Sequence, residues 1–259
     1  MLFTVFACTF AIAQSDPQAL VSKMVDNELH AQKTSHYWMY VDSNTKPHSS
    51  EVKRVLETSQ CWLNWPISIN GQPPSAQQEQ QARAHLEQLV QDPTIREKNR
   101  KELNQDAHKA NTLLQILPDA FLFTPEGEQN GSIKLAFRPN PHYNPPSDEA
   151  KVFHHMAGTL LINAKETRLA GISGKLTSNV EFGWGILGKI RKGGTFSVAQ
   201  SEVAPGDWEV TRLDVHISGR ALFFHSISEQ QHEVKTGFQP VPRDITLEHA
   251  ASIVQHPPA

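Results

Sequence analysis

Cysteine, charge of one sign and long apolar segments are all scarce in this chain. Its 259 residues include two cysteines, and 24 Lys and Arg stand against 27 Asp and Glu, for a formal net charge of −3. This balance argues against a protein that neutralises nucleic-acid phosphates, so we expect no nucleic-acid partner. Beyond the N-terminus no run reaches the roughly 20 apolar residues that a transmembrane helix needs. The composition is that of a globular protein, not of a collagen, a coiled coil or a disordered chain.

The short motifs of common enzymes and metal sites are also missing. The sequence has no His-Glu-x-x-His, no Cys-x-x-Cys, no Gly-x-Ser-x-Gly and no Gly-Lys-Ser/Thr loop. His154 and His155 form a doublet, but we expect them on a strand, where neighbouring side chains point to opposite faces. We therefore predict no metal, no cofactor and no catalytic residue.

The first 13 residues, MLFTVFACTFAIA, are uncharged and almost wholly apolar. They are too short to span a bilayer and end in a small-x-small pattern, Ala11-Ile12-Ala13, of the kind that signal peptidase cuts. No basic residue precedes Lys23, so a buried N-terminal strand remains the alternative. We predict a signal peptide over 1–13 and export to the periplasm or the outer membrane. Cleavage would leave Cys61 as the single thiol, which excludes an internal disulfide and a cysteine-based zinc site.

The first half of the remaining chain predicts one helix, three strands and a helical insertion. Asp16-Pro17 is an N-cap followed by a first-turn proline, and apolar residues recur behind it at helical spacing. Strands are predicted over 36–41, 51–60 and 61–69. From about 75 to 117 the chain is rich in Gln, Glu, Lys and Arg, with Ser75 and Gln78 placed as a capping box. We predict two helices there, the second stopped by Pro118.

After Asp119 the pattern is that of β-structure almost to the end, with a last short helix from Asp244. If Pro205-Gly206 and Ser218-Gly219 are two-residue turns, their registers align apolar residues on one face of three strands. This predicted apolar ladder consists of Phe196, Val198, Leu213, Val215, Leu222 and Phe224. We expect it to line either a ligand cavity or the core.

The opposite face of the same strands carries polar residues. Ser197, Arg212, Asp214 and His225 share it in this register. Asp214 and His225 could form an acid–base pair with Ser197 as a nucleophile. Solvated cross-strand charge pairs explain the same residues more simply.

Large apolar side chains alternate with glycines and cations between Phe182 and Gly194. Such a segment suits a membrane interface, where rings enter the bilayer and cations meet anionic headgroups. A hairpin with its tryptophan in the core is the alternative. The candidate membrane-contact residues are Trp184, Ile186, Leu187, Lys189, Arg191 and Lys192.

Several stretches resemble an uncharacterised family of exported bacterial proteins. They are FGWGILG from Phe182, KGGTFS from Lys192, EVAPGDW from Glu202, LDVHISGRALFF from Leu213, FQPVP from Phe238, LPDAF from Leu117 and FRPNP from Phe137. The layout is similar to that of the lipoprotein-carrier (LolA-like) superfamily. This resemblance implies an antiparallel sheet folded into a half-barrel and covered by helices around an apolar cavity for lipid chains. The insertion at about 75–117 departs from the carriers.

The sequence therefore predicts an α+β protein: a curved antiparallel sheet, or half-barrel, covered by helices, in one domain over 14–259. The predicted function is non-enzymatic binding of a lipid, a lipidated protein or another apolar ligand in the periplasm or envelope. One alternative is a structural or interaction protein of the envelope with a filled core. A hydrolase that uses Asp214 and His225 is the other.

Overall fold

The computed structural model describes residues 16–34, 36–147, 150–182, 188–220 and 230–257. The helices are α1 (Pro17–Thr34), α2 (Ala76–Gln91), α3 (Pro93–Ala120), the 3-10 helix η1 (Ala150–His155) and α4 (Leu247–Gln255). The strands are β1 (Tyr37–Lys46), β2 (Ser49–Glu57), β3 (Trp62–Ile69), β4 (Phe121–Gln129), β5 (Ser132–Pro139), β6 (Met156–Asn163), β7 (Leu169–Leu176), β8 (Val180–Phe182), β9 (Gly188–Ile190), β10 (Thr195–Ala204), β11 (Asp207–His216), β12 (Gly219–Arg220) and β13 (Gln230–Val241).

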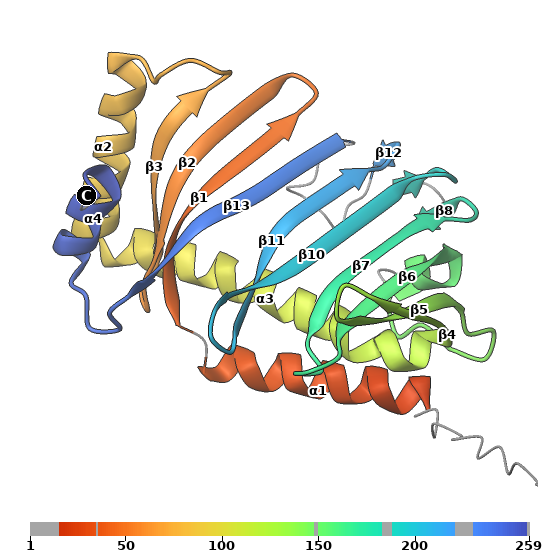
Figure 1. Cartoon of the computed structure of the whole chain (residues 1–259). Coiled ribbons are helices and arrows are strands. Elements are labelled where there is room, and N and C mark those ends of the chain that lie inside the picture. The colour runs from red at the N-terminus through yellow and green to blue at the C-terminus, as the bar shows by residue number, and fades with distance from the viewer. Residues whose placement is uncertain (1–15, 35, 148–149, 183–187, 221–229, 258–259) are drawn as a thin grey trace, which may run out of the picture.

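Ten of the strands form one open antiparallel sheet in the order β3-β2-β1-β13-β11-β10-β7-β6-β5-β4 (Figure 1). The remaining three form a small sheet, β12-β9-β8. The α+β class and the large antiparallel sheet predicted from the sequence are confirmed. Between β1 and β11 the sheet receives β13 from the far end of the chain, so both ends of the sequence meet in its middle.

Local sequence signals predicted the start of α2 correctly but missed the end of α3 and the start of α4. The Ser75 hydroxyl accepts a hydrogen bond from the Gln78 amide while the Gln78 side chain accepts one from the Ser75 amide, which is the predicted capping box. The stop at Pro118 is wrong, because α3 continues to Ala120 with the proline inside its last turn. The last helix begins at Leu247 with Thr246 as its N-cap, and not at Asp244.

The predicted register of β10 and β11 is confirmed in the half of the hairpin that is remote from its turn. Phe196 pairs with Val215, and Val198 with Leu213. The second predicted hairpin, at Ser218-Gly219, is wrong: the other neighbour of β11 is β13, with Val215 opposite Gln231. Gly219 pairs instead with Ile190 of β9. A strand has only two edges, and β10 and β13 occupy both edges of β11.

Helices cover opposite faces of the sheet at its two ends. Directly paired residues share a face, and one such row runs Leu135, Leu160, Ile172, Val198, Leu213, Glu233 and Asn44. We call this side the α1 face, because Leu135 and Leu160 are buried in one core cluster with Val21 and Met24 of α1. Leu117 of α3 belongs to the same cluster. In Figure 1, α1 passes the ends of these strands, and α3 crosses behind the strands to meet α1 near its own C-terminal end.

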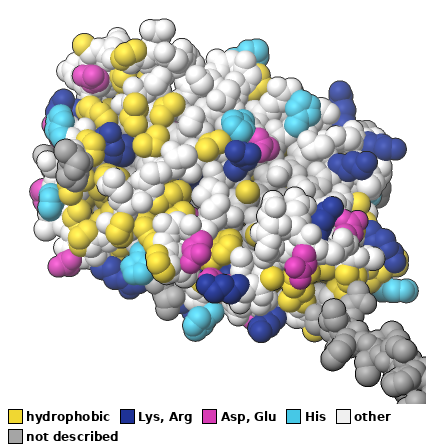
Figure 2. All heavy atoms as spheres, viewed as in Figure 1, with side chains coloured by type: hydrophobic (Ala, Val, Ile, Leu, Met, Phe, Trp, Pro, Cys, Tyr) yellow, Lys and Arg dark blue, Asp and Glu magenta, His cyan; other side chains and the backbone are white. Residues whose placement is uncertain are grey.

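The other side, the α4 face, is covered at the β1–β3 end. Met39, Leu56 and Leu63 lie on it and pack with α2 and α4, which stand together beside β3 (Figure 1). Figure 2 shows hydrophobic side chains gathered over this end of the molecule. Partly buried members of the cluster are Tyr37, Trp65, Val90, Ile95, Ile245 and Ile253. The core cluster that contains residues of α1 and α3 includes no residue of β1, β2 or β13, so it does not extend over the α1 face of these three strands.

Two glycines allow close contact on the α1 face. A Cβ at Gly174 would lie 2.8 Å from the Phe196 ring and 3.2 Å from the Phe137 ring, and a Cβ at Gly158 would lie 2.0 Å from the Ser173 carbonyl oxygen. The aromatic rings of β5 and β10 therefore occupy space that a side chain on β7 would otherwise fill.

Candidate functional site

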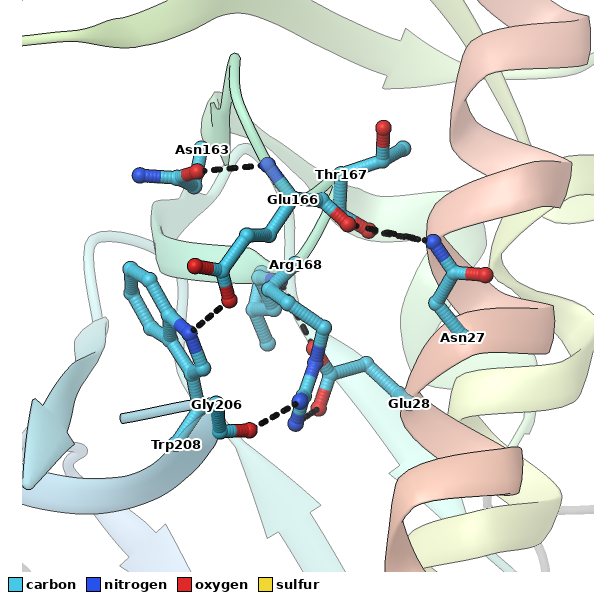
Figure 3. Close-up of polar contacts among 9 residues, drawn as sticks. Asn27, Glu28, Asn163, Glu166, Thr167, Arg168, Gly206 and Trp208 are labelled. Carbon is cyan, nitrogen blue, oxygen red and sulfur yellow. Dashed lines mark hydrogen bonds and ion pairs between the residues drawn. The ribbon is translucent and has the colours of Figure 1, made fainter. Parts of the chain in front are cut away.

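The C-terminal half of α1 is tied to the sheet by a buried ion pair (Figure 3). Arg168, at the start of β7, donates to both carboxylate oxygens of Glu28 over 2.7 and 3.1 Å, and the Leu169 amide donates to Glu28 over 2.8 Å. Both residues are at least nine-tenths buried. Because every hydrogen bond to the carboxylate is charge-assisted or comes from the backbone, the pair fixes α1 in one position on the sheet.

The β10–β11 hairpin joins the same cluster. The Trp208 indole N–H donates to the Glu166 carboxylate over 2.9 Å, and the Arg168 guanidinium lies 3.5 Å from the Gly206 carbonyl oxygen (Figure 3). The Asn27 amide donates to the carbonyl oxygens of Glu166 and Thr167. Helix α1, the β6–β7 turn and the tip of the hairpin thus form one unit that borders the α1 face.

Sequence reasoning missed this cluster, although one signal was present. Glu28 follows Met24 by four residues, so it falls on the apolar stripe of the first helix. A carboxylate in that position indicates a buried cationic partner. The identity of the partner, Arg168, 140 residues away, has no local signal.

A pocket of about 450 Å³ lies across four strands at the ends remote from this tether. Its lining consists of the triplets 45–47, 195–197, 214–216 and 230–232. Their middle residues, Lys46, Phe196, Val215 and Gln231, share the α1 face by pairing and alternation. On the α1 face, the lining is apolar on β10 and β11, with Phe196 and Val215, and polar on β13 and β1, with Gln231 and Lys46.

Four residues of the predicted apolar ladder lie together here. Phe196 and Val215 line the pocket, and Val198 and Leu213 form the next row along the same face. Phe196 also packs against the core cluster beneath α1, and Val215 is buried. Leu222 and Phe224 lie outside the described residues.

A polar network begins at the pocket and continues along the α1 face. The Gln231 amide nitrogen donates to Glu233 over 3.0 Å, and the Asn44 amide nitrogen lies 3.5 Å from the same carboxylate oxygen. Farther along, Lys235 lies 3.3 Å from Glu233. On the neighbouring strands, Lys53 lies 3.5 Å from Asp42.

Aromatic side chains close the far end of this network. The Tyr40 and Phe238 rings stack at 5.0 Å between centroids, and Lys235 lies over the Tyr40 ring. Burial, with the nearby Glu209 carboxylate, raises the pKa of Glu57 to about 7. Burial also raises the pKa of Asp42. Carboxylates in this part of the sheet therefore hold their protons unusually tightly.

Hydrogen-bond acceptors are left over on the α1 face. Among the described residues, Asp42 Oδ1, Asn44 Oδ1 and Gln231 Oε1 are buried without a hydrogen-bond partner. Asp42 is 6% exposed and Gln231 is 8% exposed. Buried polar atoms normally have partners, so these oxygens mark a place where water or a ligand group completes the structure.

Two of the proposed hydrolase residues, Ser197 and Asp214, lie next to each other among the described residues. On the α4 face Ser197 pairs with Asp214, and Asp214 pairs with His232, whose Nδ1 lies 2.5 Å from the carboxylate. The aspartate stands in the middle, whereas a triad needs the histidine between nucleophile and acid. Asp214 and His232 are also well exposed, as a solvated cross-strand pair is. His225 lies outside the described residues.

The candidate membrane-contact segment is described only in part. Trp184, Ile186 and Leu187 lie outside the described residues, Lys189 belongs to β9, and Arg191 and Lys192 are exposed. Ile190, between these cations, is buried in the core cluster beneath α1. The part of the segment that is described therefore turns one apolar side chain inward and two cations outward.

No group of three or more His, Cys, Asp or Glu side chains among the described residues is placed to hold a metal ion. His154 and His155 lie in η1, so the prediction of a strand there is wrong. They still make separate contacts: His154 with the Tyr143 carbonyl oxygen and His155 with the Ser178 hydroxyl. Within the described ranges, each helix is too short or too polar to span a bilayer.

A second hollow, of about 560 Å³, lies between α1 and α3. Four of its six lining residues are polar in type, and the lining consists of Leu29, Gln32, Lys33, Ala107, Asn111 and Gln115. Its lining residues all belong to the two helices, and none of them is a site residue predicted from the sequence. The pocket across the four strands is therefore the better candidate site.

Comparison with known proteins gives no family for the chain: no protein-family model and no curated protein matches it.

Proposed function

We propose that this protein is a non-enzymatic binding protein of the cell envelope that holds a lipid, a lipidated protein or another apolar ligand on the α1 face of its sheet. The observation that carries the proposal is the pocket of about 450 Å³ whose lining includes Phe196 and Val215. Its volume falls within the range of small-molecule sites, roughly 300–1,000 Å³. Beside the pocket, an apolar row of Leu213, Val198 and Ile172 continues across the sheet to Leu160 in the core, which suits an alkyl chain.

The proposal includes a LolA-like half-barrel in which the α1 face is concave. Val203 and Ala204 at the end of β10 pack against the cluster of Trp38, Tyr40 and Val55, although β11 and β13 stand between β10 and β1. In a flat sheet three strand spacings amount to about 14 Å, beyond side-chain contact for these residues.

Binding of a fluorescent apolar probe tests this function. N-phenyl-1-naphthylamine should brighten on addition of the full chain and be displaced by dodecanol. Val215→Gln, which puts an amide into the apolar half of the pocket, should weaken the probe at least fivefold. Ile67→Gln is the matched control, because Ile67 is exposed on the edge strand β3. Equal binding by both variants would contradict the proposal.

One observation favours a second candidate, a structural or interaction protein of the envelope. The space between the sheet and helices α1 and α3 is occupied by a core cluster of aromatic and aliphatic side chains, so an apolar ligand has room only beyond its border. If the wild-type chain fails to bind the probe, this second function is the one to keep.

Export and membrane contact belong to the proposal as well. Residues 1–13 support cleavage by signal peptidase, which N-terminal sequencing of the protein from the envelope fraction would detect. Arg191 and Lys192 are exposed cations beside the predicted membrane-contact segment. Their joint replacement by Gln should reduce co-sedimentation with anionic vesicles, whereas replacement of Lys98 and Lys101 on α3 should not.

A further inference from the structure

We propose that the ligand is an amphiphile with a hydrogen-bond-donating, positively charged headgroup, a primary ammonium, which binds the buried acceptors next to the pocket. This inference rests on the proposed function, because the alkyl chain is assigned to the apolar half of the same pocket. It adds what the polar half recognises.

The orientation of two amides carries the inference. Gln231 and Asn44 both direct their amide nitrogens at Glu233, as their hydrogen-bond distances of 3.0 and 3.5 Å indicate. Their carbonyl oxygens are therefore turned away from that carboxylate, and both are buried without a partner among the described residues. Gln231 lines the pocket itself, so a group that enters beside Val215 meets acceptors.

The charges on this part of the face point the same way. Lys53 and Lys235 each lie beside one carboxylate, Asp42 and Glu233. The second oxygen of Asp42 remains without a hydrogen-bond partner. Buried acceptors are thus in excess beside carboxylates, and a cationic group that donates several hydrogen bonds supplies what is missing.

An anionic headgroup is the competing ligand, because Lys46 stands at the edge of the pocket. A sulfate or a fully ionised phosphate, however, offers only acceptors to Gln231, Asn44 and Glu233. It would leave the buried oxygens unpaired and add like charge beside a carboxylate, which costs free energy. An ammonium group donates three hydrogen bonds from one atom. We therefore place the ammonium on the buried side, at Gln231 and Asn44.

Isothermal titration of the full chain with four probes of one chain length tests the inference: dodecylammonium, dodecyltrimethylammonium, dodecyl sulfate and dodecanol, each below its micelle concentration. Dodecylammonium should bind about tenfold more tightly than dodecyltrimethylammonium, which has the charge without the donors. It should also bind more tightly than dodecyl sulfate. Equal affinity for all four, or a preference for the sulfate, would overturn the headgroup assignment and leave the apolar site intact. Absence of binding by all four would overturn the proposed function itself.

Variants of Gln231 separate recognition from folding. Gln231→Met removes the acceptor at similar size and should weaken dodecylammonium about tenfold, with dodecyltrimethylammonium unchanged. Gln231→Glu adds a charged acceptor and should tighten dodecylammonium, an effect that a misfolded chain cannot give. Glu97→Gln, on the exposed surface of α3, should leave all four affinities as they were. A Gln231→Met chain that still discriminates ammonium from trimethylammonium would contradict the assignment.

Discussion

The carboxylate of Glu28 and the guanidinium of Arg168 form a bidentate pair across 140 residues of sequence, with distances of 2.7 and 3.1 Å. The pair joins α1 to the first residues of β7 at a depth where both side chains are nearly inaccessible to solvent. Desolvation of two charges is costly, and the pair recovers that cost only while both partners are present. The position of α1 on the sheet therefore depends on both residues together.

Removal of one partner of this pair should destabilise the fold strongly. We expect Glu28→Gln and Arg168→Met each to lower the free energy of unfolding by about 3–5 kcal/mol, because each leaves an uncompensated buried group. The double variant should be less destabilised than the sum of the two. Urea unfolding measures all three. Single variants that lose less than about 1 kcal/mol would show that the pair is not buried as described.

Stability should fall as the pH rises through the range in which Glu57 ionises. The folded chain holds this proton with a pKa of about 7, against 4.5 for the unaltered side chain. Between these values the unfolded chain binds fewer protons, so the free energy of unfolding decreases with pH, by up to about 3 kcal/mol in total. The effect is complete by about pH 8, where Glu57 is ionised in the folded chain as well. Asp42 and Glu209, whose pKa values are also raised, act in the same direction.

Glu57→Gln isolates this contribution, since the amide oxygen can still accept from the Trp38 backbone. The variant should show a flatter dependence of unfolding free energy on pH between 5 and 8 and should exceed the wild type in stability at pH 8. Glu97→Gln, on an exposed helix surface, should follow the wild-type curve. A wild-type stability that rises over this interval would argue against a buried, poorly compensated carboxylate.

Gly158 should not tolerate a side chain. A Cβ there would lie 2.0 Å from the Ser173 carbonyl oxygen and 2.5 Å from the Gly174 Cα, both backbone atoms of the neighbouring strand. We expect Gly158→Ala to cost about 3 kcal/mol or more by thermal unfolding. Gly171→Ala, where the nearest atom is 3.2 Å away, is the matched substitution and should cost less. A mild effect at Gly158 would mean that β6 and β7 are not in this register.

The N-terminus of α2 should depend on Ser75. Its side chain and that of Gln78 satisfy each other's backbone amides. Ser75→Ala should cost about 1 kcal/mol, and Ser75→Asp should restore most of it. Hydrogen exchange of the first turn of α2 reports the effect locally, and unchanged protection in Ser75→Ala would contradict it.

Local rules recovered much of the fold from the sequence. The capping box at Ser75 and the apolar pairs Phe196–Val215 and Val198–Leu213 depend on neighbours or on one tight turn, so spacing alone determines them. The partner of β11 on its other edge is β13, a choice that depends on the whole sheet. A prediction that pairs each strand with the next one along the chain cannot identify β13 as this partner.

The site was predictable only on its apolar side. Phe196 and Val215 followed from alternation, but Asp42, Asn44 and Glu233 have the composition of a solvated strand face. They are directed inward because their strands share the α1 face with buried apolar rows several strands away. The pairing of Glu28 with Arg168 was hidden for the same reason, since tertiary packing and not spacing brings the two together.

Photo-crosslinking tests the central claim, that an alkyl chain lies on the α1 face at Phe196 and Val215, most directly. A dodecylamine analogue with a diazirine near the end of its chain would be irradiated with the full chain, and the labelled peptides identified by mass spectrometry. We expect label within 195–198 and 213–216, lost on competition with dodecylammonium. Label confined to the hollow between α1 and α3, or spread evenly over the surface, would contradict it.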